Sequence, residues 1–407
     1  MQRGVVIVGG GHAGGRVAER LRAQGFKDTI DVIGSETELP YERPPLSKAC
    51  LLGPDLIANA YLLPEQRWRD LEVTFHLGNE AVAIDRAARR VHLDNGRHLA
   101  YRHLVLATGL SPRRLDALGP VASGVSYLRD FADAGRLRDR LRPGLRLLII
   151  GAGLIGLEVA ASAVSRGSHV TIIEAAPRPL TRLFPQALSH WLSQVHQEAG
   201  ARILCGRMVV DAVAWEEGVR VTLDDGRMIM ADEILVAIGG QPNDNLAQRA
   251  GLTVDDGIVV NEFGQTSDPD IFAIGDVARH HNEIFARGWR LESWRNAEDM
   301  AAVVAANLCG LRQAYREVPW FWTDQYDWNI QIAGVPAAGA DILTRGEMGQ
   351  RGHLAYYCDG RHLRGAVGIG CGRDIRIARE IMRSGAAIDR SDLAKRGFVS
   401  QAEPVGA

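Results

Sequence analysis

Two short runs of consecutive apolar residues, VVIV and LLII, begin at Val5 and Leu147, and the same series of features follows each of them. A Gly-x-Gly-x-x-Gly stretch comes next, and then a segment whose apolar residues recur with helical spacing. In the first copy Ala13, Val17 and Leu21 fall on one helical face, and Gly25 is placed to end the helix. A second strand-like run, TIDVIG or HVTIIE, follows each helix. The pattern predicts two βαβ units, each in a parallel sheet.

The rest of the pattern predicts further strands, two hairpins and a different C-terminal region. Apolar runs ending at Gly109 and Gly240 indicate strands, and the alternating segments RVHLDNGRHL and VRVTLDDGRMI indicate hairpins with Asn-Gly and Asp-Gly turns. A helix is predicted in ESWRNAEDMAAVVAANLCG. From Pro319 the chain becomes aromatic and alternates short strands before a final helix in RDIRIAREIMRSG. This indicates a smaller α+β domain, with QAEPVGA as a frayed tail.

Composition and charge narrow the classes of partner. The chain has 407 residues, enough for two or three domains, and its 47 basic and 49 acidic residues are mixed, with a net charge of −2. This distribution has no basic stripe of the kind that nucleic-acid binding needs, so a small molecule or a protein is the expected partner. No apolar stretch has membrane-spanning length, and the early strand leaves no room for a signal peptide. We therefore expect a soluble, cytoplasmic protein.

The five cysteines give no sign of a metal centre. They are scattered, none forms C-x-x-C, and none has the spacing of iron–sulfur or zinc ligands. A reduced compartment fits this usage.

The glycines of the repeated stretch are typical of dinucleotide binding. The first glycine allows a tight turn, the second lets the backbone approach a pyrophosphate, and the third lets helix and strand pack closely. The helix N-terminus then offers unpaired N–H groups to the phosphates. The two sets are Gly9, Gly11 and Gly14, and Gly151, Gly153 and Gly156. Two copies in the same strand-to-helix context predict two bound dinucleotides.

An acidic residue at the end of the second strand indicates which nucleotide is bound. Glu174 closes HVTIIE, where a carboxylate binds both ribose hydroxyls and repels a 2′-phosphate, which favours NADH over NADPH. Arg178 and Arg182 lie close by in the sequence, and either could contact the pyrophosphate or a 2′-phosphate. In the first unit the ribose is expected to bind Ser35 or Glu36, and Glu36 is preferred.

Further motifs carry a resemblance to a known family. LPYERPPLSK, LVLATG, TSDPDIFAIGDVA, RLESWRNAED and PWFWTDQYD, in this order, resemble the NADH-dependent ferredoxin and rubredoxin reductases, which are FAD flavoproteins. More narrowly, the chain is similar to the reductase components of bacterial aromatic-ring dioxygenases such as the phenylpropionate and biphenyl systems. The similarity extends to about residue 385. It implies electron transfer from NADH through FAD to a small [2Fe–2S] ferredoxin that feeds an oxygenase.

The same resemblance implies an α/β fold with two Rossmann-like domains, as in glutathione-reductase-like flavoproteins, and a small α+β C-terminal domain. Because the second glycine motif is inserted before the Gly-Asp strand of the first domain, the FAD-binding domain is expected to be discontinuous. We expect it at 1–112 and 242–318, the NAD-binding domain at 113–241 and a C-terminal interface domain at 319–407.

The candidate catalytic groups are Lys48, Glu158 and Trp320, and Arg43 is a candidate cofactor contact on the same loop as Lys48. The resemblance implies that Arg43 neutralises the FAD pyrophosphate and that Lys48 reaches the flavin ring. The two prolines between these cations fix φ and present them with little loss of entropy. Glu158 resembles the carboxylate at the flavin–nicotinamide junction and is expected to pair with Lys48, and Trp320 is expected beside the isoalloxazine.

Other cofactor contacts follow from the same resemblance. For FAD they are His12 (through its backbone only), Ala13, Ala81, Ala107, Thr108, Gly109, Arg129, Asp276 and Trp294. For NADH they are Leu154, Ile155 and Gly239.

Alternatives remain at this stage. The acceptor could be a cytochrome P450 ferredoxin or a rubredoxin. A disulfide, CoA-disulfide or peroxide reductase would need a redox cysteine beside the flavin, and the only candidate, Cys50, has no second cysteine nearby and is expected to be buried. A flavoprotein resembling apoptosis-inducing factor would favour a targeting segment or a basic DNA-facing surface.

The C-terminal region leaves the partner open. Its scattered arginines could form a patch for an acidic ferredoxin or could be a solvated face. They are Arg361, Arg364, Arg373, Arg376 and Arg379. Two departures from the family pattern, Trp328-Asn329 after QYD and the stretch GIGCGRD, also lie there.

Overall fold

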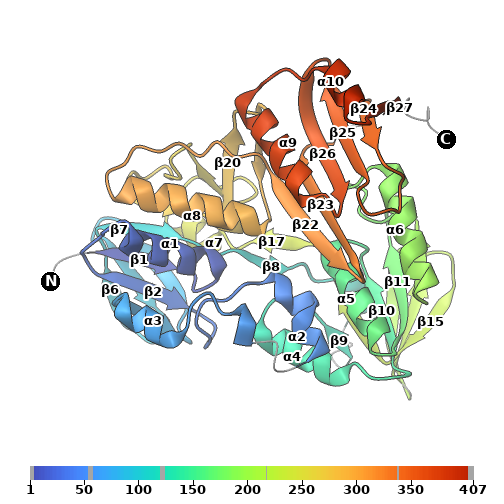
Figure 1. The fold of residues 1–407 in the computed structure, drawn as a ribbon. Helices are drawn as coiled ribbons and strands as arrows, with labels where there is room; N and C mark the ends of the chain where they lie inside the picture. The colour runs from blue at the N-terminus through green and yellow to red at the C-terminus, as the bar shows by residue number, and fades with distance from the viewer. Residues whose placement is uncertain (1–3, 54–57, 120–123, 217, 337–338, 402–407) are drawn as a thin grey trace. The chain divides into compact units, whose positions relative to one another are not determined.

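The computed structural model describes residues 4–53, 58–119, 124–216, 218–336 and 339–401 (Figure 1). The chain divides into two compact units. The first unit comprises Met1–Arg43, Ala58–Ser111 and Gln241–Pro319, and the second comprises Pro44–Ile57, Pro112–Gly240 and Trp320–Ala407. Among the described residues no helix has the length and apolar character needed to cross a membrane.

A parallel five-stranded sheet in the order β19-β7-β1-β2-β3 forms the centre of the first unit. Its strands are β1 (Val5–Val8), β2 (Ile30–Gly34), β3 (Val73–Leu77), β7 (His103–Leu106) and β19 (Ile271–Ala273). Helices α1 (His12–Ala23) and α8 (Trp294–Leu308) lie side by side (Figure 1). Val17 and Leu21 are fully buried, and Gly25 follows α1 with a φ of +83°, which confirms the predicted face and helix end.

Smaller elements complete this unit. They are α3 (Glu65–Asp70), β4 (Ala81–Asp85), β5 (Arg90–Leu93), β6 (His98–Ala100), α7 (Asn245–Arg249), β18 (Ile258–Val260), the 3₁₀ turn η5 (Gly275–Val277), β20 (Ala278–Asn282) and β21 (Arg287–Arg290). Strands β5 and β6 form the predicted Asn-Gly hairpin within a three-stranded sheet. β8 (Leu110–Pro112) and β17 (Gly240–Pro242) fall where the chain passes between the units.

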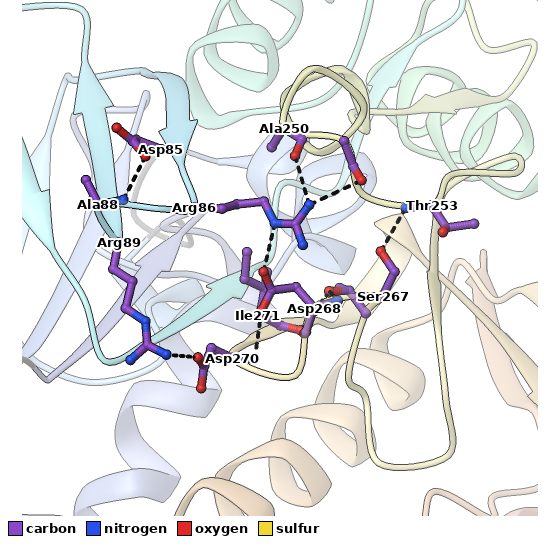
Figure 2. Close-up of polar contacts among 12 residues, drawn as sticks. Asp85, Arg86, Ala88, Arg89, Ala250, Thr253, Ser267, Asp268, Asp270 and Ile271 are labelled. Carbon is purple, nitrogen blue, oxygen red and sulfur yellow. Dashed lines mark hydrogen bonds and ion pairs between the residues drawn. The ribbon is translucent and has the colours of Figure 1, made fainter.

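The TSDPD stretch anchors the β4–β5 hairpin to the start of β19 (Figure 2). Arg86 donates to Asp268 at 2.7 Å, and Arg89 forms an ion pair with Asp270. The backbone N–H of Ile271, the first residue of β19, donates to the Asp268 carbonyl at 3.0 Å. Because these ion pairs are partly exposed, each contributes at most about 1 kcal/mol, and their role is to fix the strand's entry.

The second unit also has a parallel five-stranded sheet, in the order β12-β11-β10-β16-β9. Its strands are β9 (Val125–Ser126), β10 (Arg146–Ile150), β11 (His169–Glu174), β12 (Arg202–Cys205) and β16 (Glu233–Val236). The associated elements are η1 (Pro44–Ser47), α2 (Ala49–Leu52), α4 (Phe131–Arg140), α5 (Leu154–Ser165) and α6 (Gln186–Glu198), with an antiparallel sheet of β13 (Val209–Trp215), β14 (Gly218–Leu223) and β15 (Met228–Ala231). The β14–β15 hairpin is the predicted Asp-Gly hairpin.

The C-terminal part of the second unit is a six-stranded antiparallel sheet in the order β22-β23-β26-β25-β24-β27, with α9 packed on β23 and β26 (Figure 1). The strands are β22 (Trp320–Gln325), β23 (Trp328–Gly334), β24 (Asp341–Arg345), β25 (Leu354–Asp359), β26 (His362–Ile369) and β27 (Val399–Gln401). The helices are α9 (Gly372–Ser384) and α10 (Arg390–Lys395).

The prediction that α9 is the final helix is wrong, because α10 and β27 follow it. These elements are too short to show a local period, and β27 is held as a strand by pairing with β24. Residue 401 belongs to β27, and residues 402–407 of the predicted tail lie outside the described residues.

Candidate active site

The two predicted βαβ units begin with the same backbone turn. Gly9 has a φ of +117° and Gly151 a φ of +107°, a region that residues with a side chain rarely adopt. The N–H of Gly9 donates to the Ile33 carbonyl at 2.8 Å, and that of Gly151 donates to Ile173 at 2.7 Å. The internal repeat in the sequence is therefore a repeat of conformation and hydrogen bonding.

The third glycine of each motif is required by close packing. A Cβ at Gly14 would collide with the carbonyl oxygen of Gly9, and a Cβ at Gly156 would collide with that of Gly151. Each helix start is thus pressed against the turn that precedes it, as the sequence predicted.

The second glycine of each motif leaves space instead. The nearest atom to a Cβ at Gly11 would be Nη2 of Arg43, at 3.5 Å, and at Gly153 it would be the Ala237 carbonyl oxygen, at 4.0 Å. Open space beside a helix N-terminus fits a pyrophosphate, and in the first unit a guanidinium already lies at its edge. The residues present therefore fit a dinucleotide in each unit.

The acidic residue of the first unit lies close to that cation. Glu36 forms an ion pair with Arg43 and accepts a hydrogen bond from the Tyr41 hydroxyl. Arg43 also donates to the Tyr41 hydroxyl at 2.6 Å, and its guanidinium lies 4.6 Å from the ring centre. Ser35 is exposed. The structure thus brings Gly11, Arg43 and Glu36 together, the set expected to hold FAD phosphate and ribose.

The Gly-Asp motif lies against the same helix start. Gly275 has a φ of +72°, and a Cβ there would stand 3.0 Å from that of Ala13. This contact places Asp276, in η5, next to the first glycine motif. Trp294, the first residue of α8, packs its ring 5.5 Å from the ring of His12.

His12 has a side-chain role that the sequence analysis missed. Its buried Nε2 lies 3.0 Å from Oε1 of Glu298 on α8. Arg16 and Arg20 also contact this carboxylate, at 2.5 and 2.8 Å. Burial opposes ionisation of Glu298, but these three partners outweigh it and lower its pKa to about 2. A basic residue at every fourth position of α1 was the available signal.

The strand end LVLATG is braced by one asparagine. Thr108 Oγ1 donates to the Asn243 carbonyl at 2.7 Å, and the Asn243 side chain donates to the Thr108 carbonyl at 2.9 Å. Gly109 follows with a φ of +64°, while Ala107 and the more distant Ala81 are buried. Ala81 begins β4 and pairs with Leu93 of β5.

In the second unit Glu174 is held at the glycine turn. Its two carboxylate oxygens accept the backbone N–H groups of Ala152, at 2.7 Å, and Ala176, at 2.8 Å. Arg178 donates to the Phe184 carbonyl at 2.7 Å and is occupied within its own loop, whereas Arg182 is exposed. The carboxylate therefore lies where a ribose is expected, and Arg182 is the more accessible of the two arginines.

The first turn of α5 exposes apolar surface. Ile155 is 46% exposed, Leu154 is half-buried, and Gly239 adopts a φ of +100° after β16. Arg129 lies elsewhere in this unit, just before α4, where its N–H donates to Asp133 at 2.8 Å.

Lys48 and Glu158 form the predicted ion pair within the second unit. Nζ of Lys48 lies 3.0 Å from Oε1 of Glu158, which is only 6% exposed. Ser47 donates to the other carboxylate oxygen at 2.5 Å, and Thr323 on β22 donates to Oε1 at 2.7 Å. Three such partners hold the buried carboxylate at a fixed position.

Two tryptophans of β22 accompany this pair. Trp320 and Trp322 stack with ring centres 5.1 Å apart, and Nζ of Lys48 lies 5.8 Å from the Trp322 ring. Both rings are half-exposed rather than buried in the core. Trp320 also donates to Gln331 at 3.3 Å, and Arg379 of α9 lies 5.8 Å from its ring centre.

The remaining C-terminal features have local explanations. Trp328 packs edge-on against Trp191, with ring centres 5.1 Å apart, and Asn329 donates to Asp324 at 2.6 Å. In GIGCGRD a Cβ at Gly368 would stand 2.7 Å from that of Cys371, so the glycine allows α9 to pack closely on β26.

Cys50 is fully buried, and burial raises the pKa of its thiol. All five cysteines are free. A buried thiol with a raised pKa is poorly suited to be the redox nucleophile of a disulfide reductase.

Comparison with known proteins gives the family. Residues 3–301 match the model "Pyridine nucleotide-disulphide oxidoreductase", and residues 320–399 match "Reductase C-terminal". The chain belongs to the pyridine nucleotide-disulphide oxidoreductase family. Its curated relatives include ferredoxin reductases, and with the family match they make it an oxidoreductase of the NADH-dependent ferredoxin reductase group, with FAD and NADH as cofactors. This confirms the predicted family, fold class and cofactors.

Three curated relatives resemble the chain over most of their length. The anthranilate 1,2-dioxygenase system ferredoxin–NAD(+) reductase component of Burkholderia cepacia is 42% identical and covers 96% of each chain. Rhodocoxin reductase of Rhodococcus erythropolis is 39% identical (97% of this chain, 92% of that one), and putidaredoxin reductase of Pseudomonas putida is 40% identical (88% and 86%).

Two solved structures match the fold. The putidaredoxin reductase in its covalent complex with putidaredoxin superposes with a TM-score of 0.92 at 36% identity, covering 96% of this chain and 95% of that one. The ferredoxin reductase for the CYP199A2 system of Rhodopseudomonas palustris also gives 0.92 at 36% identity, with 97% and 100% covered.

Proposed function

We propose that this protein passes electrons from NADH through FAD to a small [2Fe–2S] ferredoxin, which feeds an aromatic-ring-hydroxylating dioxygenase. The observation that carries the proposal is the ion pair between Lys48 and the buried Glu158, beside the half-exposed tryptophans of β22. A fixed ion pair suits a site beside a flavin, and half-exposed aromatic rings next to it suit electron transfer from the flavin to a protein bound at the surface.

The division of labour follows the expected domains. FAD is assigned to residues 1–112 and 242–318, through the glycine turn, Arg43, Glu36 and Asp276. NADH is assigned to residues 113–241, through the second glycine turn and Glu174. The region 319–407 is assigned as the interface for the protein partner.

Each charged side chain then has a stated task. FAD supplies the ability to take two electrons from NADH and release them singly. Arg43 balances phosphate charge, and Glu174 binds ribose hydroxyls and disfavours a 2′-phosphate. Lys48 presents positive charge toward the flavin, while Glu158 fixes that ammonium and faces the nicotinamide. Trp320 excludes water on the acceptor side.

The ferredoxin is assigned to the arginines of the C-terminal region. Arg373 and Arg376 are exposed on α9, and Arg379 of the same helix lies against Trp320. Arg361 lies in the β25–β26 turn, and Arg364 lies within β26. An acidic partner is favoured by the α9 residues, since complementary charge speeds a transient encounter.

A second acceptor class has its own support. One structural relative is the reductase for the CYP199A2 system, and it is as similar in fold as the putidaredoxin reductase. A cytochrome P450 ferredoxin is therefore the alternative partner, with the same chemistry at the flavin.

The test is anaerobic. Purified FAD-loaded protein is mixed with NADH or NADPH, flavin bleaching is followed, and an oxidised [2Fe–2S] ferredoxin from a dioxygenase or a P450 system is then added. Rapid bleaching by NADH with recovery driven by ferredoxin supports the proposal, and the faster ferredoxin identifies the system. Recovery driven only by a disulfide or a peroxide would overturn the acceptor.

A further inference from the structure

A line of buried polar side chains leads away from Glu158. Thr323 donates its hydroxyl proton to Glu158, and the side-chain amide of Gln325 donates to the Thr323 hydroxyl at 3.0 Å. Thr323 is 1% exposed and Gln325 is fully buried. Both are on β22 two residues apart, so the strand's alternation places them on one face.

The line continues to a histidine on α6. Nε2 of His196 lies 2.7 Å from Oε1 of Gln325, and the Tyr326 hydroxyl lies 3.1 Å from Nδ1 of His196. His196 is fully buried, and this burial lowers its pKa. The ring is therefore neutral at pH 7 and carries one proton.

The hydrogen bonds fix where that proton is. Because the amide nitrogen of Gln325 donates to Thr323, its oxygen faces His196 and accepts, so Nε2 of His196 carries the proton. Nδ1 is then the acceptor for Tyr326. Every donor in the line points toward Glu158, and hydrogen bonds aligned in this way strengthen one another.

These hydrogen bonds stabilise the Glu158 carboxylate and do not form a proton relay. An amide cannot pass a proton on without becoming an imidic acid, so Gln325 interrupts a relay. What the aligned donors do is stabilise a carboxylate and fix its position.

The turn after β22 fixes the far end of the line. Tyr326 has a φ of +53° in the two-residue turn between β22 and β23, where a positive φ at the first residue is usual for a hairpin turn of this length. The turn sets its ring against His196, with ring centres 5.1 Å apart.

We propose that His196, Gln325 and Thr323 are positioning residues for hydride transfer, which hold the Glu158 carboxylate and, through it, Lys48. The proposal rests on the roles proposed above for Glu158 and Lys48. It gives α6 and β22 a part in the reaction although, of these three residues, only Thr323 contacts the ion pair.

Matched substitutions test the line in the FAD-loaded protein. Thr323→Val keeps the shape and removes the hydroxyl, and His196→Leu removes the donor at the other end, while Thr323→Ser and His196→Gln restore a donor. His190, exposed on the same helix, provides the control His190→Leu. Anaerobic stopped-flow measures the rate of flavin reduction and the Kd for NADH.

We expect Thr323→Val and His196→Leu to slow reduction about tenfold with the Kd changed less than about threefold, because misplacement of a catalytic group acts on the rate. Thr323→Ser, His196→Gln and His190→Leu should stay within about threefold of the parent rate. Equal losses in Thr323→Val and Thr323→Ser would contradict the proposal.

Two further measurements separate positioning from general packing. In a Glu158→Gln background, Thr323→Val should slow reduction by no more than about twofold, since residues acting as one unit are not additive. Full additivity would overturn the proposal. Separately, ¹⁵N-histidine NMR, assigned with His196→Gln, should show a neutral ring protonated on Nε2. The Nδ1 tautomer or a doubly protonated ring at pH 7 would also overturn it.

Failure of the proposed function looks different. If Glu158→Gln itself leaves flavin reduction unchanged while the NMR shows the Nε2 tautomer, the catalytic role of Glu158 is wrong and the positioning proposal falls with it. If Glu158→Gln slows reduction and Thr323→Val does not, only the positioning proposal is wrong.

Discussion

Glu158 is a buried carboxylate that Lys48, Ser47 and Thr323 contact directly. Removing Lys48 alone should therefore lower the stability more than replacing both Lys48 and Glu158. Lys48→Met leaves the Glu158 charge buried with only the Ser47 and Thr323 hydroxyls, and we expect it to lower the free energy of unfolding by about 2–4 kcal/mol. Urea unfolding of the FAD-loaded protein measures this.

The double variant Lys48→Met/Glu158→Gln should be destabilised less than Lys48→Met alone, because neither charge is then left alone. Lys395, three-quarters exposed and paired with Asp392 at 2.9 Å, provides the control. Lys395→Met should change stability by less than about 0.5 kcal/mol. A similar loss from both lysines would mean that burial does not distinguish the two pairs.

Glu174 carries the second prediction at this scale. Since both of its oxygens already accept backbone N–H groups, the carboxylate is fixed before NADH binds. Glu174→Ala should weaken NADH binding on the order of tenfold and narrow the preference over NADPH, because a hydrogen bond to each ribose hydroxyl and a repulsion are lost together. The ratio of kcat/KM for the two nucleotides measures the effect. An unchanged ratio would remove Glu174 from nucleotide selection.

The glycine turn is the element that the two units share, and its third glycine is where backbone packing leaves no room. Gly156→Ala should therefore displace the start of α5 and weaken NADH binding at least about tenfold while FAD is retained. Gly135, in the middle of α4, offers the control, since the nearest atom to a Cβ there would be 3.9 Å away. Gly135→Ala should leave NADH binding unchanged and stabilise the protein by about 0.5–1 kcal/mol. NADH titrations and FAD content measure both.

Elements with a local period were predictable. The βαβ units, the hairpins at Asn95-Gly96 and Asp225-Gly226 and helix α8 follow from spacing and turn residues within a few positions. Helix α10 and strand β27 did not follow, because a short helix and an edge strand are decided by what they pack against.

Polar clusters, like secondary structure, were predictable only where the sequence itself carries a signal. The Lys48–Glu158 pair was expected from family resemblance, whereas the Glu298 and His196 clusters join residues more than a hundred positions apart. The regular spacing of basic residues on α1 indicates one side of the Glu298 cluster, but nothing in the sequence identifies the partner on α8 or links His196 to β22. Only contact in the fold reveals them.

At the scale of the whole molecule, two buried groups of the first unit make the stability depend on pH. Each resists protonation in the folded state, but in a different range of pH. His280 is 2% exposed, and neither ring nitrogen has a hydrogen-bond partner among the described residues. Burial, with a smaller effect of His281, lowers its pKa to about 4. Glu298, by contrast, has a pKa of about 2 because His12, Arg20 and Arg16 outweigh the effect of burial.

Both lowered pKa values make the folded protein less stable as the pH falls, but over different ranges of pH. As pH falls below 6.5, His280 takes up a proton in the unfolded protein, whereas in the folded protein it does so only near pH 4. The free energy of unfolding therefore declines by up to about 3 kcal/mol over that range. Glu298 contributes about 3 kcal/mol that is present above pH 4.5 and lost as pH falls toward 2.

Two variants should therefore diverge from the parent in separate ranges. His280→Phe should gain on the parent between pH 6.5 and 4, because it has no proton to take up and keeps the contact with Tyr315. Glu298→Gln should be less stable than the parent by about 3 kcal/mol at pH 7, and the gap should close only below pH 4.5. Urea midpoints of the FAD-loaded proteins from pH 7.5 to 3 measure both, with His98→Gln, at an exposed position on β6, as the control. If the His280→Phe advantage were constant across this range, the histidine would affect packing alone, and acid sensitivity would have to come from elsewhere in the chain.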